Sequence, residues 1–189
     1  MSVDTTYETL RARAEGSNVD PTTLLATDYL NHLNEPVMLL EMLPDMPDLG
    51  DELLAWQPKS YTEHFEESAI ADRELAIEAY QYVPEQYRLP FEFTIRAVTR
   101  RVEALRDGTI EALAAEDDTR ARQMVSEGLS GIHDLLGVAN AIIHGCTRRD
   151  ELHGQQTAQP TPAPMAEAAD EDGGVEVIMS QDEIDSMFD

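Results

Sequence analysis

Basic residues are scarce in this chain. The sequence contains 13 Lys and Arg against 38 Asp and Glu, so the formal net charge is −25, and Lys59 is the only lysine. Phosphate backbones and anionic lipid headgroups are bound by clusters of basic side chains. The composition therefore argues against a nucleic-acid partner and against docking on anionic lipid. A basic surface on another protein is the partner that this charge favours.

Cysteine is nearly absent, and long hydrophobic runs are missing. Cys146 is the only cysteine, which excludes an internal disulfide framework and a cysteine-based zinc site. No run of 18 or more apolar residues is present, and residues 1–20 contain no apolar stretch like the core of a signal peptide. We therefore expect a cytoplasmic protein without membrane insertion.

Sustained period-two alternation is absent, whereas apolar residues recur at helical spacings of three and four. The sequence therefore predicts an all-α fold, an antiparallel bundle of about four helices. Asp20 and Pro21 resemble a helix start, and Ser60 with Glu63 forms a capping box that opens a helix to about residue 83. The two clearest stripes contain Phe91, Ile95, Val98, Val102 and Leu105, and then Val125, Leu129, Ile132, Leu136, Ala139 and Ile143.

The last of these stripes has strict heptad spacing, which also suits the seam of a homodimer. Packing within one chain is the stronger expectation, because the other three helices need a partner face. Trp56 is the expected buried anchor of the connection before the second helix. Met38, Met42 and Met46 are expected to fill the core and the following loop.

Composition divides the chain into four parts. We expect a flexible arm at residues 1–19, the helical bundle at 20–150, a disordered acidic linker rich in Pro and Ala at 151–174, and a docking peptide at 175–189. The stretch 155–174 has no aromatic residue and alternates Pro with Thr and Ala. Such a segment cannot bury enough apolar surface to offset the entropy of ordering.

No catalytic residue, metal ligand or cofactor site is predicted for the bundle. Di-iron bundles use Glu-x-x-His, and this chain has only the reverse order, in His32/Glu35 and His64/Glu67. Helical surface pairs of this kind are far commoner than metal sites. Cys146 follows a helix end and does not lie at the positive helix start that would activate a thiol, and no Gly-rich phosphate loop is present.

The C-terminal peptide is the most informative segment. Ser180 and Glu183 form a second capping box, and Ile184, Met187 and Phe188 fall on one face of the helix that would follow. That helix is only about two turns long, and an isolated helix this short is marginal in water. We therefore expect the peptide to become helical when it binds a partner.

The stretch Met-Ser-Gln-Asp-Glu-Ile-Asp-Ser-Met-Phe resembles the N-terminal peptide of the flagellar motor switch protein of the FliM type. That peptide binds the phosphorylated chemotaxis response regulator CheY. The resemblance implies that three apolar side chains pack on the output face of a CheY-type regulator and that Asp185 supplies a polar contact. Here the motif is C-terminal and covers about ten residues. The expected partner-binding residues are Met179, Ser180, Gln181, Glu183, Ile184, Asp185, Met187 and Phe188.

The layout of a helical body, a linker and a regulator-binding peptide is also similar to the chemotaxis phosphatase of the CheZ type. Such phosphatases place an acid and a glutamine one helical turn apart, but the pair with this spacing here, Glu151 and Gln155, straddles Gly154. Another phosphatase type uses Glu-x-x-Asn, which Asp28 and Asn31 approach most closely. The sequence thus favours an adaptor, with a phosphatase and a motor structural protein as alternatives.

Overall fold

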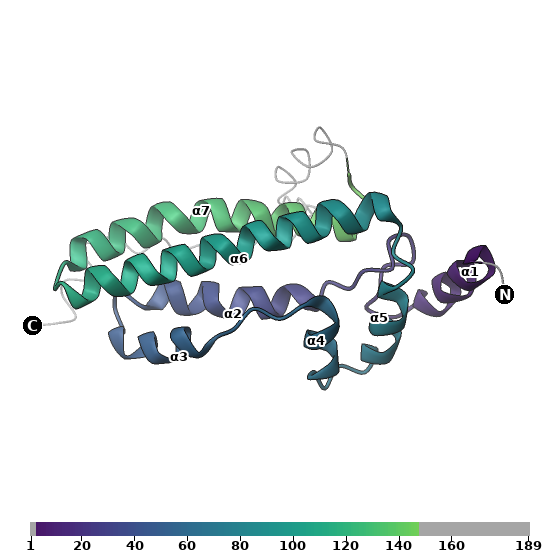
Figure 1. Cartoon of the computed structure of the whole chain (residues 1–189), viewed down its shortest axis with the longest axis horizontal. Helices are drawn as coiled ribbons and strands as arrows, with labels where there is room; N and C mark the ends of the chain where they lie inside the picture. The colour runs from purple at the N-terminus through teal and green to yellow at the C-terminus, as the bar shows by residue number, and fades with distance from the viewer. Residues whose placement is uncertain (1–2, 148–189) are drawn as a thin grey trace, which may run out of the picture. The chain divides into compact units, whose positions relative to one another are not determined.

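The computed structural model describes residues 3–147, and every regular element among them is a helix, which confirms the predicted all-α fold (Figure 1). The linker and docking peptide predicted beyond this range lie outside the described residues. The elements are α1 (Val3–Ala14), α2 (Tyr29–Met42), the 3-10 helix η1 (Pro47–Leu49), α3 (Gly50–Ala55), α4 (Tyr61–Glu66), α5 (Arg73–Tyr80), α6 (Glu85–Ala114) and α7 (Asp118–Ile143).

The two longest helices, α6 and α7, form an antiparallel hairpin, and α2 packs along both (Figure 1). The Asp117 carboxylate caps α7 by accepting a hydrogen bond of 3.0 Å from the Arg120 backbone N–H. The predicted stripe of α7 is buried, with Ile132 fully inaccessible. Its partner face is provided by α6 and α2 of the same chain, as the intramolecular alternative predicted.

The first long helix starts later than predicted. Asp20 caps a turn, because its carboxylate accepts hydrogen bonds from the Thr22 and Thr23 backbone N–H groups at 2.8 and 3.1 Å. Leu24 then adopts a φ of +61°, a conformation that a right-handed helix excludes. The chain becomes helical only at Tyr29, so the helix predicted to begin at Pro21 was placed eight residues too early.

The predicted capping box at Ser60 is confirmed. The Ser60 hydroxyl accepts from the Glu63 backbone N–H at 3.3 Å, and the Glu63 carboxylate accepts from the Ser60 N–H at 2.8 Å. The helix that it opens ends at Glu66 rather than near residue 83, and α5 is a separate helix. At this break Ser68 donates its hydroxyl proton to the Phe65 carbonyl oxygen, a local bond that competes with helix continuation. With short helices counted, the described residues hold seven α-helices rather than about four.

Residues 1–19, predicted as a flexible arm, contain α1 instead. Leu10 and Ala14 are buried in the core, and Arg13 forms an ion pair of 2.7 Å with Glu78 of α5. The Tyr7 hydroxyl donates a hydrogen bond of 2.8 Å to the Thr22 carbonyl oxygen. This short helix was missed because only a few apolar side chains mark its buried face.

The end of α7 is closed by a Schellman motif. Gly145 has a φ of +86°, its N–H donates to the Ile142 carbonyl oxygen, and the Cys146 N–H donates to that of Ala141. A glycine suits this position because it has no Cβ to clash at positive φ. Gly145 therefore ends α7.

Candidate functional site

Aromatic rings and histidines gather where α2, α4, α5 and α6 meet. Trp56, expected to be a buried anchor, is only 6% exposed and stacks on His32 with ring centroids 5.2 Å apart. The Tyr61 and Tyr80 rings stack at 4.4 Å with an angle of 14° between their planes. The cluster consists of Tyr29, His32, Trp56, Tyr61, His64, Phe65, Tyr80 and Phe91.

Hydrogen bonds to the backbone hold these rings in fixed positions. The Tyr61 hydroxyl accepts from the Ala26 N–H at 2.8 Å, and the Tyr29 hydroxyl donates to the Lys59 carbonyl oxygen at 2.8 Å. Trp56 Nε1 donates to the His32 carbonyl oxygen at 3.2 Å. The segment between α3 and α4 is thereby attached to α2 at several points.

His32 is part of this framework in its neutral form. Its Nε2 atom accepts a hydrogen bond of 3.0 Å from the Lys59 backbone N–H, which requires an unprotonated nitrogen. Burial, followed by the neighbouring His64 and Lys59, lowers the pKa of His32 to about 4. Burial and the charge of Lys59 also lower the pKa of His64.

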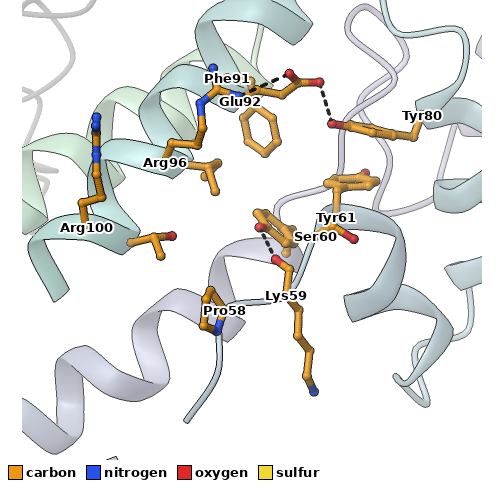
Figure 2. Close-up of a pocket in the computed structure, with 12 residues that line it drawn as sticks. Pro58, Lys59, Ser60, Tyr61, Tyr80, Phe91, Glu92, Arg96 and Arg100 are labelled. Carbon is orange, nitrogen blue, oxygen red and sulfur yellow. Dashed lines mark hydrogen bonds and ion pairs between the residues drawn. The ribbon is translucent and has the colours of Figure 1, made fainter. Parts of the chain in front are cut away.

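A cleft of about 530 Å³ opens beside the aromatic cluster, between α6 and residues 58–61 (Figure 2). We call it the α6 cleft. Aromatic rings form its inner wall, and basic side chains of α6 stand at its edge. The lining residues are Tyr29, Pro58, Lys59, Ser60, Tyr61, Tyr80, Phe91, Glu92, Ile95, Arg96, Thr99 and Arg100.

A short polar chain crosses the edge of the α6 cleft. The Tyr80 hydroxyl donates a hydrogen bond of 3.2 Å to Glu92, whose other carboxylate oxygen lies 3.7 Å from the Arg96 guanidinium (Figure 2). Burial, followed by the negative charge of Glu92, raises the pKa of Tyr80 to about 12. The phenol is therefore a hydrogen-bond donor at neutral pH and not a base.

Three of the 13 basic side chains of this acidic protein line the α6 cleft. The Lys59 ammonium forms an ion pair of 2.8 Å with Glu67, and Arg96 is paired with Glu92. Arg100 differs, since within residues 3–147 no carboxylate lies within ion-pair distance of its guanidinium. The α6 cleft thus carries one cation that the described part of the chain leaves uncompensated.

The weaker chemical candidates from the sequence do not form a site in the described region. Within residues 3–147, no group of three or more His, Cys, Asp and Glu side chains is placed to hold a metal ion. Asp28 lies before the first residue of α2, and Asn31 is exposed in the first turn. The other acid–amide pair, Glu151/Gln155, lies outside the described residues.

The eight predicted partner-binding residues, which fall between Met179 and Phe188, also lie outside the described residues. The α6 cleft, in contrast, was not predicted from the sequence. Two features pointed to it: Arg96 and Arg100 lie one turn apart, and the only lysine lies beside a capping serine. Neither feature shows by itself that residues 58–61 lie against α6.

None of the helices between residues 3 and 147 combines the length and the apolarity that crossing a lipid bilayer requires. The chain matches no family model, and comparisons with curated proteins and with solved structures found no significant similarity.

Proposed function

We propose that this protein is a chemotaxis or motility adaptor that binds a CheY-type response regulator through residues 179–188. One observation carries the proposal. Ser180, Gln181, Glu183, Ile184 and Asp185 occur in the same order and spacing as in the regulator-binding peptide of the FliM-type switch protein.

The physical character of the peptide supports the same function. Its capping box favours a helix, and Ile184, Met187 and Phe188 would form one apolar anchor on that helix. The acidic residues around the anchor suit a basic recognition surface, and they would increase the association rate at low salt. The all-α body, with a core of its own, supplies a folded domain to which this peptide is attached.

The direct test measures binding of the full chain to a CheY-type regulator, phosphorylated and unphosphorylated. We expect tighter binding to the phosphorylated form. Ile184→Ala, Met187→Ala and Phe188→Ala should each weaken binding, because each removes part of the apolar anchor. Asp185→Asn should weaken it less, because an exposed polar contact contributes only about 1 kcal/mol.

Met165→Ala is the matched control for Met187→Ala. It makes the same substitution in residues 151–174, outside the proposed motif, and should leave affinity unchanged. A chain ending at Gly174 should lose binding altogether. Equal affinity of the truncated and full-length chains would show that the peptide is not the recognition element.

The same mixture of full chain and phosphorylated regulator also distinguishes an adaptor from a phosphatase and from a motor structural protein. The rate of phosphate loss from the regulator should be unchanged if the protein is an adaptor. An increase in that rate, abolished by truncation at Gly174, would instead establish a phosphatase. Absence of any binding would reject both the adaptor and the phosphatase, and it would favour a motor structural protein.

A further inference from the structure

We propose that the α6 cleft is a binding site for a small organic monocarboxylate with a flat, apolar body. The proposal does not depend on the docking peptide. It is built on the arrangement of Arg100, Ile95 and the aromatic wall within residues 3–147.

The size and lining of the cleft suit a small molecule. Its volume of about 530 Å³ lies in the range of ligand pockets, about 300–1,000 Å³, which are mostly apolar with a few well-placed polar groups. Pro58, from the segment before α4, and Ile95, from α6, both line the cleft. A flat ring in the cleft would also reach Phe91 and Tyr61, whose side chains are buried (Figure 2).

Two rows of side chains run along the lining face of α6 at intervals of four residues, so each row lies nearly parallel to the helix axis. A ligand lying across the two rows would place its apolar body on the first row and its anionic end on the second. The first row contains Phe91, Ile95 and Thr99, and the second contains Glu92, Arg96 and Arg100.

The charge of the second row selects a single carboxylate. Glu92 already offsets Arg96, and Glu67 offsets Lys59, which leaves Arg100 with no carboxylate partner in the described region. A guanidinium matches the geometry of a carboxylate and can donate two parallel hydrogen bonds to it. A second carboxylate on the ligand would find no unpaired cation among the other side chains that line the cleft.

The charge of the whole chain favours a small ligand over an acidic macromolecule. A net charge of −25 repels a partner that carries many negative charges, whereas a monoanion experiences mainly the local field of Arg100. A planar aromatic acid that stacks in the cleft and ends in one carboxylate therefore fits both the local and the overall charge.

The test uses the full chain and 2-naphthoate, with neutral 2-naphthamide as the matched probe. Binding is followed by titration of nuclear magnetic resonance shifts. We expect naphthoate to shift the signals of Ile95, Thr99 and Tyr80. Arg100→Gln should weaken naphthoate binding about tenfold, since it removes a charge-assisted interaction, while naphthamide should bind both proteins equally.

Arg120→Gln is the charge control. Arg120 lies in the first turn of α7, which follows the end of α6 at Ala114. That end lies about 20 Å along the helix from Arg100 at a rise of 1.5 Å per residue. This variant should bind naphthoate like the wild type. Both arginines are exposed, so neither substitution disturbs the core.

Four results would overturn the proposal. Equal weakening of binding by Arg120→Gln and by Arg100→Gln would show that the effect comes from net charge alone. Equal affinity of the wild-type protein for naphthoate and naphthamide would exclude carboxylate recognition. Failure of naphthoate to bind at millimolar concentration would exclude the site. Displacement of naphthoate by an equal concentration of a synthetic peptide of residues 179–189 would show that the α6 cleft binds acidic peptides instead.

Discussion

The Thr23 hydroxyl donates a hydrogen bond of 2.6 Å to the carbonyl oxygen of Ile143, 120 positions later in the chain. The same hydroxyl oxygen accepts from the Leu25 backbone N–H at 3.2 Å. One buried side chain therefore satisfies a carbonyl at the end of α7 and an amide in the loop before α2. It joins the first and last parts of the described fold.

Thr23→Val should destabilise the protein by about 1–3 kcal/mol. Valine has a similar shape but leaves the Ile143 carbonyl and the Leu25 amide without their buried partner. Chemical denaturation monitored by circular dichroism gives the change in free energy of unfolding. Thr22→Val, at an exposed neighbour, is the control, and equal stability of the two variants would contradict the assigned role of Thr23.

Leu136→Ala should lower the free energy of unfolding by about 2–5 kcal/mol, the usual cost of truncating a packed core leucine. Leu136 is 8% exposed and lies in the buried stripe of α7. Leu89→Ala makes the same change at a side chain that is 52% exposed and should have much less effect. An unchanged melting temperature of Leu136→Ala would place this face of α7 outside the core.

Gly128 and Gly108 should respond in opposite directions to alanine. A Cβ atom at Gly128 would lie 2.8 Å from the branched end of Leu105, so Gly128→Ala should force α6 and α7 apart and destabilise them. A Cβ at Gly108 meets only the flexible end of Met124, which can move. Gly108→Ala should therefore gain helix propensity, up to about 1 kcal/mol. Parallel thermal denaturation of the two variants checks the difference in sign.

His32 should make stability depend on pH between about 6.5 and 4. Its pKa falls from 6.5 in the unfolded chain to about 4 in the folded protein. Within this window the unfolded chain binds a proton that the folded protein does not, so the free energy of unfolding decreases as pH falls. Above pH 6.5 His32 is neutral in both states, and its contribution is constant.

The contribution of His32 should have a slope of at most about 1.4 kcal/mol per pH unit. His32→Gln retains an acceptor for the Lys59 N–H but cannot titrate, so it should flatten this part of the profile. Urea denaturation of both proteins at several pH values isolates the difference from the titration of carboxylates. Parallel profiles would show that His32 is not the titrating group.

Helical periodicity predicted α7 and most of α6, but the predicted stripe of α6 began at Phe91, whereas the helix begins at Glu85. Their stripes continue through interior positions such as Pro90 and Gly108, because burial of the whole face outweighs a local preference for a break. The start of α2 was wrong because Asp20 stabilises a turn through its side chain, and the same residue types cap both turns and helices. The positive φ of Leu24, which prevents an earlier helix, has no signature in the sequence.

Met38, Met42 and Met46 show that apolar side chains can lie on the exposed side of a helix. They were expected to fill the core and the following loop, yet they are 56%, 41% and 53% exposed. The buried side of α2 is formed instead by Leu33, Val37 and Leu40. Two sides of α2 carry apolar residues, and the packing of α6 and α7 determines which side is buried.

The α6 cleft was beyond sequence reasoning for a related reason. Its basic edge comes from α6, whereas Pro58 and Lys59 come from a connecting segment more than 30 positions earlier. Periodicity describes each helix separately and says nothing about which loop lies against it. The burial and hydrogen bonds of Tyr29 and Tyr61, which hold that segment in place, depend on the finished fold.

The packing of α2 against the α6–α7 hairpin has a consequence for biosynthesis. A ribosome completes α2 about 100 residues before it completes α7, which corresponds to roughly 5–20 s at 5–20 residues per second. During that interval the leucine-rich side of α2 has no hairpin to cover it. The leucines of α2 therefore stay exposed on the nascent chain until the final helix is complete.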